Sequence, residues 1–219
     1  DILGNGTSCM VVTSMGPQPT QYYYNFAGQV AIDDGPLRSL KPHLLHQIDN
    51  SLGAVTSIQY CSSTRFYLAA KVQNKPWKTQ LPFPVQVVEK IIITDRLSGL
   101  RLTQTFQYHD GFYDATERAF RGFGYVETRD TEIEIEEKEH FSPPVCTKTW
   151  HYTGAQTKYS KLTNHWGAFF KGDKDDEDDH DYFPELALDQ DIKQGGEPLI
   201  QQAFAALNGT VMRNEVFAC

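Results

Sequence analysis

Three carboxylates lie close together in the sequence, and they are its strongest candidates for chemistry. They are Asp110, Asp114 and Glu117, within the stretch YHDGFYDATERAFRGFGYVETRD at residues 108–130. Two carboxyl groups placed on either side of a glycosidic bond can act as acid and as nucleophile or base, which is the chemistry of glycosidases. Arg118 and Arg121 lie beside them and offer ion-pair partners. We therefore favour a structural interpretation of these carboxylates over a catalytic one.

Short motifs of the common catalytic sites are absent from the sequence. It contains no GxSxG, no HExxH, no phosphate-binding GxxxxGKS and no GxGxxG between a strand and a helix. We predict no catalytic residue, no cofactor and no enzymatic activity.

Two segments carry oxygen-rich side chains that invite comparison with cation-binding loops. The first, at residues 1–6, has Asp1 and Asn5, but Leu3 and Cys9 stand where further oxygens would be needed. The second, GDKDDEDDHD at residues 172–181, lacks the glycine and the terminal glutamate spacing of an EF-hand. The sequence favours a plain turn and a solvated acidic loop, with cation binding as the alternative at each, and we predict no metal.

The cysteines also lack the spacing of a metal site. Cys9, Cys61, Cys146 and Cys219 are widely separated, with no CxxC and no Cys/His pattern of the zinc type. Isolated thiols are the favoured interpretation, and disulfide pairing stays open.

The elements that position the carboxylates are predicted to be strands. Apolar and polar residues alternate over residues 100–108, which indicates a strand that ends at a tight turn on Asp110-Gly111. A polar segment at residues 114–118 then leads through Phe120 into a second strand. Gly122 and Gly124 flank Phe123, which suggests that another backbone passes close by. The predicted structural motif consists of Asp110, Gly111, Tyr113, Asp114, Glu117, Arg118, Phe120, Arg121, Gly122, Phe123 and Gly124.

Alternation and turn residues predict further strands along the chain. They cover residues 9–13, 55–60, 66–72, 85–94, 132–136, 145–152 and 211–218. We expect two hairpins, one joining 55–60 to 66–72 and one joining 85–94 to the strand at 100–108. Pro198 to Asn208 carries an apolar stripe at helical spacing, with proline in the first turn and Gly209 after the end, so it predicts a short helix.

Two aromatic segments have more than one interpretation. Tyr22, Tyr23 and Tyr24 form either a packed strand, which we favour, or a recognition surface. Trp77 lies in the proline-rich segment at residues 74–84, where a tryptophan held under a loop is favoured over a sugar-binding one.

Composition limits the classes of partner. The chain has 219 residues and a net charge of −8. Its aromatic content of 12% favours strands and broad packed surfaces. It has no run of Lys or Arg, so nucleic acid is not an expected partner. No apolar segment reaches the roughly 20 residues that cross a bilayer, so we expect no membrane contact by this segment.

A series of longer motifs resembles one protein family. The pattern YHDG-Y-D---ER-FRGFG-VE--D resembles the middle region of the B component of bacterial Tc toxin complexes, the TcaC/TcdB-type proteins. The resemblance continues in DILGNGT, KPHLLHQIDNSLGA, YCSSTRFYL, KPWKTQLPFPVQVVEKI, TDRLSGL, PPVCTKTWHYTGA and ALNGTVMRNEVFA. Several long motifs in one order form a specific signal, and residues 171–195 match least.

The resemblance implies a fold and a role. The expected fold is mainly β, with antiparallel strands and hairpins that form part of a large curved sheet shell, an Rhs-like cocoon, and one short helix near the C-terminus. Residues 1–30 would end a β-propeller-like region and residues 31–219 would belong to the shell, with the whole chain a fragment of a larger protein. Its implied role is noncatalytic: the shell encloses a toxic effector.

The resemblance also implies partners and a location. These are an Rhs-repeat C component and a pore-forming A component, in a bacterial toxin complex that is secreted. The alternative from the residues alone is an autonomous β-sandwich that binds carbohydrate or protein through Tyr22 to Tyr24, Trp77 or Trp166.

Overall fold

The structure is a computed structural model that describes most of the chain. The described residues are 1–2, 4–26, 28–30, 38–40, 43–134, 144–155, 165–166 and 189–218. The chain divides into two compact units. Unit 1 comprises residues 1–68, 83–106 and 130–143, and unit 2 comprises residues 69–82, 107–129 and 144–219.

About half of the described residues lie in strands. They are β1 (Cys9–Thr13), β2 (Gln21–Asn25), β3 (Gly28–Val30), β4 (Arg38–Leu40), β5 (Gln47–Asp49), β6 (Ala54–Ser62), β7 (Gln86–Asp95), β8 (Leu100–Asp114), β9 (Ala119–Glu134), β10 (Val145–His151) and β11 (Val211–Ala218). The helices are α1 (Ser63–Val72), α3 (Gln190–Gln194) and α4 (Glu197–Ala206).

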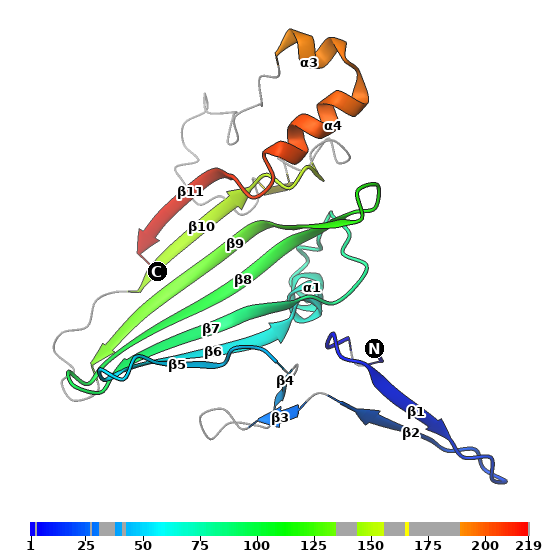
Figure 1. Ribbon diagram of the computed structural model, residues 1–219, viewed down its shortest axis with the longest axis vertical. Helices are drawn as coiled ribbons and strands as arrows, with labels where there is room; N and C mark the ends of the chain where they lie inside the picture. The colour runs from blue at the N-terminus through cyan, green and yellow to red at the C-terminus, as the bar shows by residue number, and fades with distance from the viewer. Residues whose placement is uncertain are drawn as a thin grey trace. The chain divides into compact units, whose positions relative to one another are not determined.

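Neighbouring strands of the main sheet follow one another in sequence. Its order is β11-β10-β9-β8-β7-β6-β5, while β1 pairs with β2 and β3 pairs with β4 in separate two-stranded sheets (Figure 1). The strands pair in antiparallel fashion in β1–β2, β3–β4, β5–β6, β6–β7, β7–β8 and β10–β11. This arrangement confirms the predicted mainly β fold of antiparallel strands and hairpins.

The hairpin of β7 and β8 in unit 1 agrees with its prediction. The carboxylate of Asp95 closes the connection by accepting hydrogen bonds from the amide of Leu97 at 2.9 Å and the hydroxyl of Ser98 at 2.8 Å. Gly99 follows with φ +73°, a conformation that glycine adopts without steric cost. Strand β7 packs Val87 and Ile92 into the interior, as its apolar run predicts.

The predicted strand at residues 66–72 is wrong, because this segment is the helix α1. The hairpin expected between residues 55–60 and 66–72 is therefore wrong as well, and β6 pairs with β5 and β7 instead. The preceding strand is correct and extends to Ser62 as β6. Ser62 Oγ accepts a hydrogen bond from the amide of Thr64 at 3.3 Å, and Ala69 and Ala70 favour a helix strongly. Ala70 is buried whereas Leu68 and Val72 are exposed, so the apolar alternation did not mark a buried sheet face.

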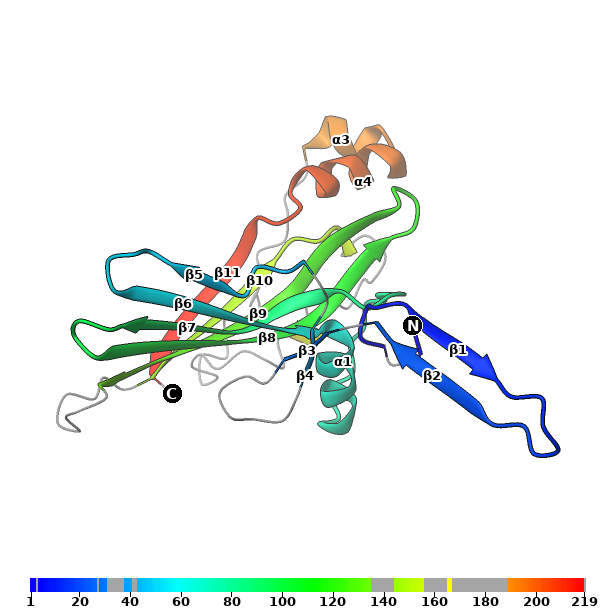
Figure 2. The same cartoon turned by 60° about the horizontal axis from the view of Figure 1, so that its bottom comes forward.

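The predicted turn at Asp110-Gly111 is also wrong. Strand β8 continues to Asp114, and the chain reverses at residues 115–118 before β9 begins (Figure 2). Asp110 does have the positive φ of a turn residue, +54°, but it adopts this conformation inside the strand. Arg118, with φ +52°, lies in the true turn.

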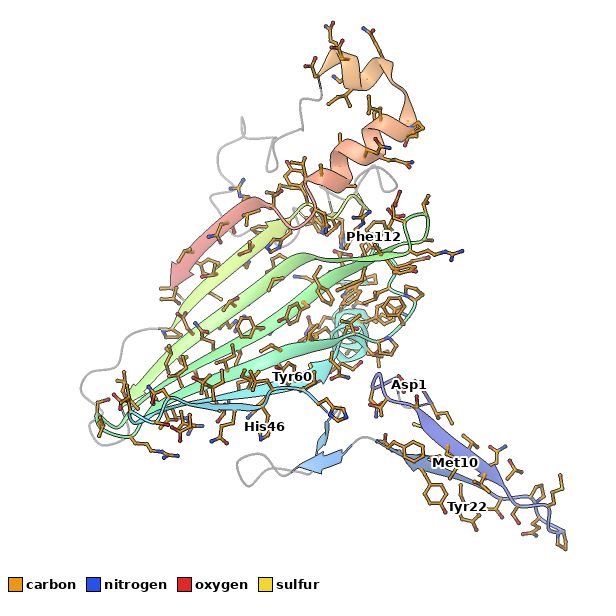
Figure 3. The ribbon with its side chains drawn as sticks, viewed as in Figure 1. Asp1, Met10, Tyr22, His46, Tyr60 and Phe112 are labelled. Atoms are coloured by element: carbon orange, nitrogen blue, oxygen red, sulfur yellow. The ribbon has the colours of Figure 1, made fainter. Side chains whose placement is uncertain are left out.

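The hairpin of β1 and β2 confirms the strand predicted at residues 9–13. Val11 pairs with Tyr23, and Met10 pairs with Tyr24. Side chains from both strands are exposed, including Met10 and Tyr22 (Figure 3). Tyr22 to Tyr24 therefore lie in a strand, as predicted, but within the described chain they are not packed.

The loop before β1 has the hydrogen bonds of a plain turn. The carboxylate of Asp1 accepts hydrogen bonds from the amides of Asn5 at 3.1 Å and Gly6 at 2.6 Å. Asn5 Oδ1 accepts one from the amide of Thr7 at 3.0 Å. These oxygens hold the loop itself, which favours the turn over a calcium site. The acidic run at residues 172–181 and the predicted strand beyond residue 134 lie outside the described residues.

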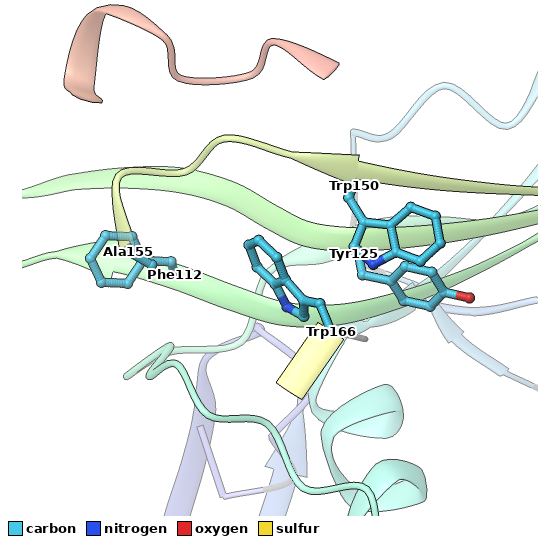
Figure 4. Packing of buried hydrophobic residues seen from close by; sticks show 5 residues of the cluster. All are labelled: Phe112, Tyr125, Trp150, Ala155 and Trp166. Atoms are coloured by element: carbon cyan, nitrogen blue, oxygen red, sulfur yellow. The ribbon is translucent and has the colours of Figure 1, made fainter. Parts of the chain in front are cut away.

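An aromatic cluster forms the core of unit 2. It contains Phe112, Tyr125, Trp150, Ala155 and Trp166, with the rings of Tyr125 and Trp150 5.2 Å apart (Figure 4). The predicted strands at 145–152 and 211–218 pair as β10 and β11.

The predicted C-terminal helix is confirmed as α4. Its proline lies in the first turn, and Gly209 follows its end with φ +82°. The structure has a further helix, α3, just before it, so two helices lie near the C-terminus where one was expected. Across the described ranges, no helix combines the length and apolar character needed to span a bilayer. Cys9, Cys61 and Cys146 form no disulfide, and Cys219 is outside the described residues.

Candidate functional site

A fully buried carboxylate, that of Asp110, is the centre of the candidate site in unit 2. Its Oδ2 atom lies 3.0 Å from His109 Nδ1 and 3.1 Å from His165 Nε2, and it accepts a hydrogen bond from Trp166 Nε1 at 2.9 Å. Its Oδ1 atom accepts hydrogen bonds from the backbone amides of Lys78 at 2.7 Å and Thr79 at 3.5 Å. We call Asp110, His109, His165 and Trp166 the Asp110 cluster.

The backbone of β8 turns this carboxylate into the interior. Four consecutive residues, 109–112, are buried, which a regular strand with one solvent face would not allow. The positive φ of Asp110 breaks the alternation, and a short polar side chain tolerates that conformation better than most. Gly111 follows because a Cβ there would lie 2.9 Å from the ring of Trp77 and 3.0 Å from Phe123.

The proline-rich loop at residues 74–84 supplies one wall of the site. Thr79 donates its hydroxyl hydrogen to the carbonyl of Gly111 at 2.9 Å, and the amide of Tyr113 donates to the carbonyl of Gln80 at 3.1 Å. Trp77 is 8% exposed, with its ring centroid 5.9 Å from that of His109. The favoured interpretation of Trp77, a tryptophan held under the loop, is therefore confirmed.

The electrostatics of Asp110 are those of a permanent anion. Burial raises the pKa of its carboxyl, but the hydrogen bonds and charges of His109 and His165 outweigh that effect and hold the pKa well below its ordinary value. A general acid needs the opposite shift, because it must carry a proton near neutral pH. The site therefore keeps the carboxyl of Asp110 ionised.

The other two carboxylates of the predicted trio have different environments. Asp114 Oδ1 accepts a hydrogen bond from the amide of Thr116 at 3.0 Å, and its Oδ2 lies 3.7 Å from Arg121 Nη2. Glu117 and Arg118 lie exposed in the turn between β8 and β9. The geometry agrees with the ion-pair interpretation of Arg121 and gives no support to a carboxylate pair across a substrate.

The glycines around Phe123 are needed for separate reasons. Gly122 has φ +91° with open space where a Cβ would project, so only its backbone conformation demands glycine. A Cβ on Gly124 would overlap Cζ2 of the Trp166 ring. A close neighbour was predicted here, but it is a side chain rather than a backbone.

Phe123 lies among other aromatic rings. Its centroid is 4.9 Å from Tyr108, 5.6 Å from Phe120 and 5.9 Å from Trp77. It is half-buried rather than fully buried. All residues of the predicted structural motif thus lie in β8, in β9 or in the turn between them.

Sequence reasoning missed two members of the Asp110 cluster. His109 was read only as part of a motif, and His165 was not singled out, although His165 and Trp166 are adjacent in sequence. The available signal was the adjacent pair His109 and Asp110 near the end of a predicted strand. His165 and Trp166 lie more than 50 residues further along the chain, so no local pattern links them to this pair.

Comparison with known proteins gives one family match and several structural matches. Residues 1–154 match the family described as insecticide toxin TcdB middle/N-terminal region. A chain of the Photorhabdus luminescens Tc holotoxin pore structure matches with 26% identity and a TM-score of 0.71, over 100% of this chain and 10% of that one.

Crystal structures of TcdB2-TccC3 and of TcdB2-TccC3-Cdc42 match with 26% identity, over 83% of this chain and 9% of those chains. Their TM-scores are 0.63 and 0.64 respectively. The chain therefore spans about a tenth of the length of the solved chains that it matches. Comparison with curated protein sequences finds no match.

Proposed function

The chain belongs to the family of the TcdB insecticide toxin middle/N-terminal region, and from this premise we propose that it is a noncatalytic structural segment of a Tc toxin B component. In this role it helps to build a hollow β-sheet shell that encloses a toxic effector. The observation that carries the proposal is the match of the whole chain, at 26% identity and a TM-score of 0.71, to a chain of a Tc holotoxin pore.

The sheet topology supports a part in a wall. Strands that neighbour one another in sequence also neighbour one another in the sheet, so the segment can extend a surface without long crossovers. Closing such a sheet with further strands removes the unpaired edges that would otherwise recruit other chains.

The proposed partners are a C component and the pore-forming A component. The support is that similar chains occur in structures of TcdB2-TccC3 and of a Tc holotoxin pore. The proposed location is extracellular, within a secreted bacterial toxin complex. Residues 1–30 would end a β-propeller-like region, and residues 31–219 would form shell.

The absence of catalysis is part of the proposal. Asp110 is buried with a lowered pKa, and Asp114 has Arg121 beside it, so neither carboxyl has the properties of a general acid. Hydrolysis of a glycan or an ester that is lost on Asp114→Ala would contradict this part.

The alternative of an autonomous carbohydrate-binding module has weak support. Trp77 and Trp166 are buried, so their rings cannot stack on a sugar in this structure. Tyr22, Tyr23 and Tyr24 are exposed and remain available to a partner.

The test uses the full-length natural protein that contains this chain. It measures whether that protein assembles with its C component. Gly124→Val places a branched side chain against Trp166, so we expect loss of co-purification and loss of protease protection of the effector. Thr128→Ser, in the same strand β9, is the matched control and should assemble normally.

Two outcomes would count against the proposal. One is a Gly124→Val protein that still protects the effector fully from protease although this segment is shown to be unfolded in it. The other is an unmodified chain that folds but neither binds a C component nor shields an effector.

A further inference from the structure

Three metal-ligating side chains converge inside unit 2. The atoms His109 Nδ1, Asp110 Oδ2 and His165 Nε2 all lie within 4.8 Å of one another. The side chains are 9%, 0% and 12% exposed respectively, so protein rather than bulk water surrounds them. Their number and chemistry match the two imidazoles and one carboxylate of many protein sites for transition metals.

The hydrogen bonds of His109 decide what its Nδ1 atom presents to Asp110. Its Nε2 atom lies 2.8 Å from the carbonyl oxygen of Lys75, and a carbonyl only accepts, so Nε2 carries a hydrogen. In the neutral ring, Nδ1 then carries a lone pair, directed at a carboxylate oxygen 3.0 Å away. Two lone-pair atoms at this distance require a positive centre, which is either a second proton or a metal ion.

We propose that this positive centre is a divalent transition metal ion of the zinc class, held by His109 Nδ1, His165 Nε2 and Asp110 Oδ2. Ligand atoms about 2.0 to 2.1 Å from a tetrahedral zinc ion lie roughly 3.3 Å apart. The two distances from Oδ2, 3.0 and 3.1 Å, need only a small expansion to reach that geometry. Two nitrogen ligands argue against calcium or magnesium, which take oxygen.

The surrounding groups suit a metal site. Metal-bound histidines usually donate their second N–H to a carbonyl or carboxylate, as His109 does to Lys75. The amides of Lys78 and Thr79 fix the other oxygen of Asp110, and the indole of Trp166 donates to Oδ2. Such partners orient a ligand before the ion arrives.

The position of the site assigns it a structural role. The ligands come from β8 and from the segment at residues 165–166, and the groups that orient them come from the loop at residues 75–79. A bound ion would join these segments, which are distant in sequence, so its binding energy would add to the stability of the fold.

The test measures metal content and local protection in the full chain. Protein stripped with a chelator, loaded with Zn²⁺ and washed should hold one more equivalent of zinc per chain than His165→Gln protein. His46→Gln removes an exposed histidine and is the matched control, so it should retain that equivalent. Cobalt(II) in the same site should give the visible absorption of a tetrahedral ion.

Hydrogen exchange gives a second readout, which does not depend on measuring zinc content. Zinc should slow amide exchange at residues 75–79, and His165→Gln should abolish that slowing. Equal zinc content in the unmodified and His165→Gln proteins, together with exchange that zinc leaves unchanged, would overturn the proposal. The cluster would then be bridged by protons alone.

Discussion

The β1–β2 hairpin and the Asp110 cluster reverse the usual distribution of side chains. The hairpin exposes Val11 and Tyr23 to solvent, the latter with 58% of its surface accessible, whereas the cluster buries a carboxylate completely. A buried charge is tolerated only where polar groups compensate for the lost water, and Asp110 accepts hydrogen bonds from the Lys78 amide and the Trp166 indole and lies beside two imidazoles. The described residues of unit 1 give the exposed apolar hairpin no comparable compensation, so we expect other parts of the proposed toxin complex to cover it.

This comparison predicts its largest effect at Asp110. Asp110→Ala removes the acceptor of the Trp166 indole and of the Lys78 amide, and leaves the indole buried without an acceptor at this position. Breaking one side of a buried charged network costs about 3 to 5 kcal/mol. Hydrogen exchange measured by mass spectrometry should show lost protection at residues 75–82.

Asp110→Asn is the matched variant, because it keeps the shape and one acceptor oxygen. It should lose less protection than Asp110→Ala. Equal protection in the unmodified protein and in Asp110→Ala would show that the cluster is not a support of unit 2.

The next effect concerns the glycines of β9. Gly124→Ala forces the buried Trp166 ring to move, and overpacking of this kind typically costs about 1 to 3 kcal/mol. Thermal unfolding of the full chain should register this cost, and Trp166→Phe in the same protein should recover part of it.

Gly122→Ala separates strain from overlap. Its cost arises from the positive φ alone, so we expect it to be unchanged by Trp166→Phe. Recovery of both glycine variants to the same extent would contradict the assignment of two different causes.

The third prediction concerns pH. The pKa of Asp110 is lowered from 3.8, so its contribution to stability is present above the pKa of the unfolded state and is lost as the pH falls through the folded one. The extra protection of the unmodified protein over Asp110→Asn should therefore persist at about pH 5 and shrink below about pH 4. Exchange at matched intrinsic rates measures this difference. Its disappearance already between about pH 7 and 5 would contradict the assignment of this dependence to Asp110.

The smallest effect on folding is expected in the hairpin. Tyr23→Ser changes an exposed side chain, so the free energy of unfolding should change by no more than about 0.5 kcal/mol. Assembly with the C and A components should nevertheless weaken if the hairpin is covered there. A marked loss of stability in the isolated full chain would show that Tyr23 is already packed within it.

Local patterns predicted the strands whose faces differ in polarity. The alternation in β8 and the apolar run of β7 gave both elements and their hairpin, and Pro198 with Gly209 gave α4. The same alternation failed at residues 66–72, because helix-forming alanines and a serine cap outweigh a short apolar pattern.

The Asp110 cluster was beyond local reasoning. Asp-Gly is a common turn signal, but here the aspartate contacts an imidazole and an indole that lie 55 and 56 residues away in sequence, respectively. Tertiary contacts therefore overrode the turn propensity, and only the folded chain brings the two histidines together.

A cryo-electron microscopy map of the full chain with its C component tests the central claim most directly. The account predicts that strands β5 to β11 lie within the wall of a closed shell, with the effector enclosed by it. A map in which residues 43–218 form a separate domain on the outside of the assembly would contradict the account.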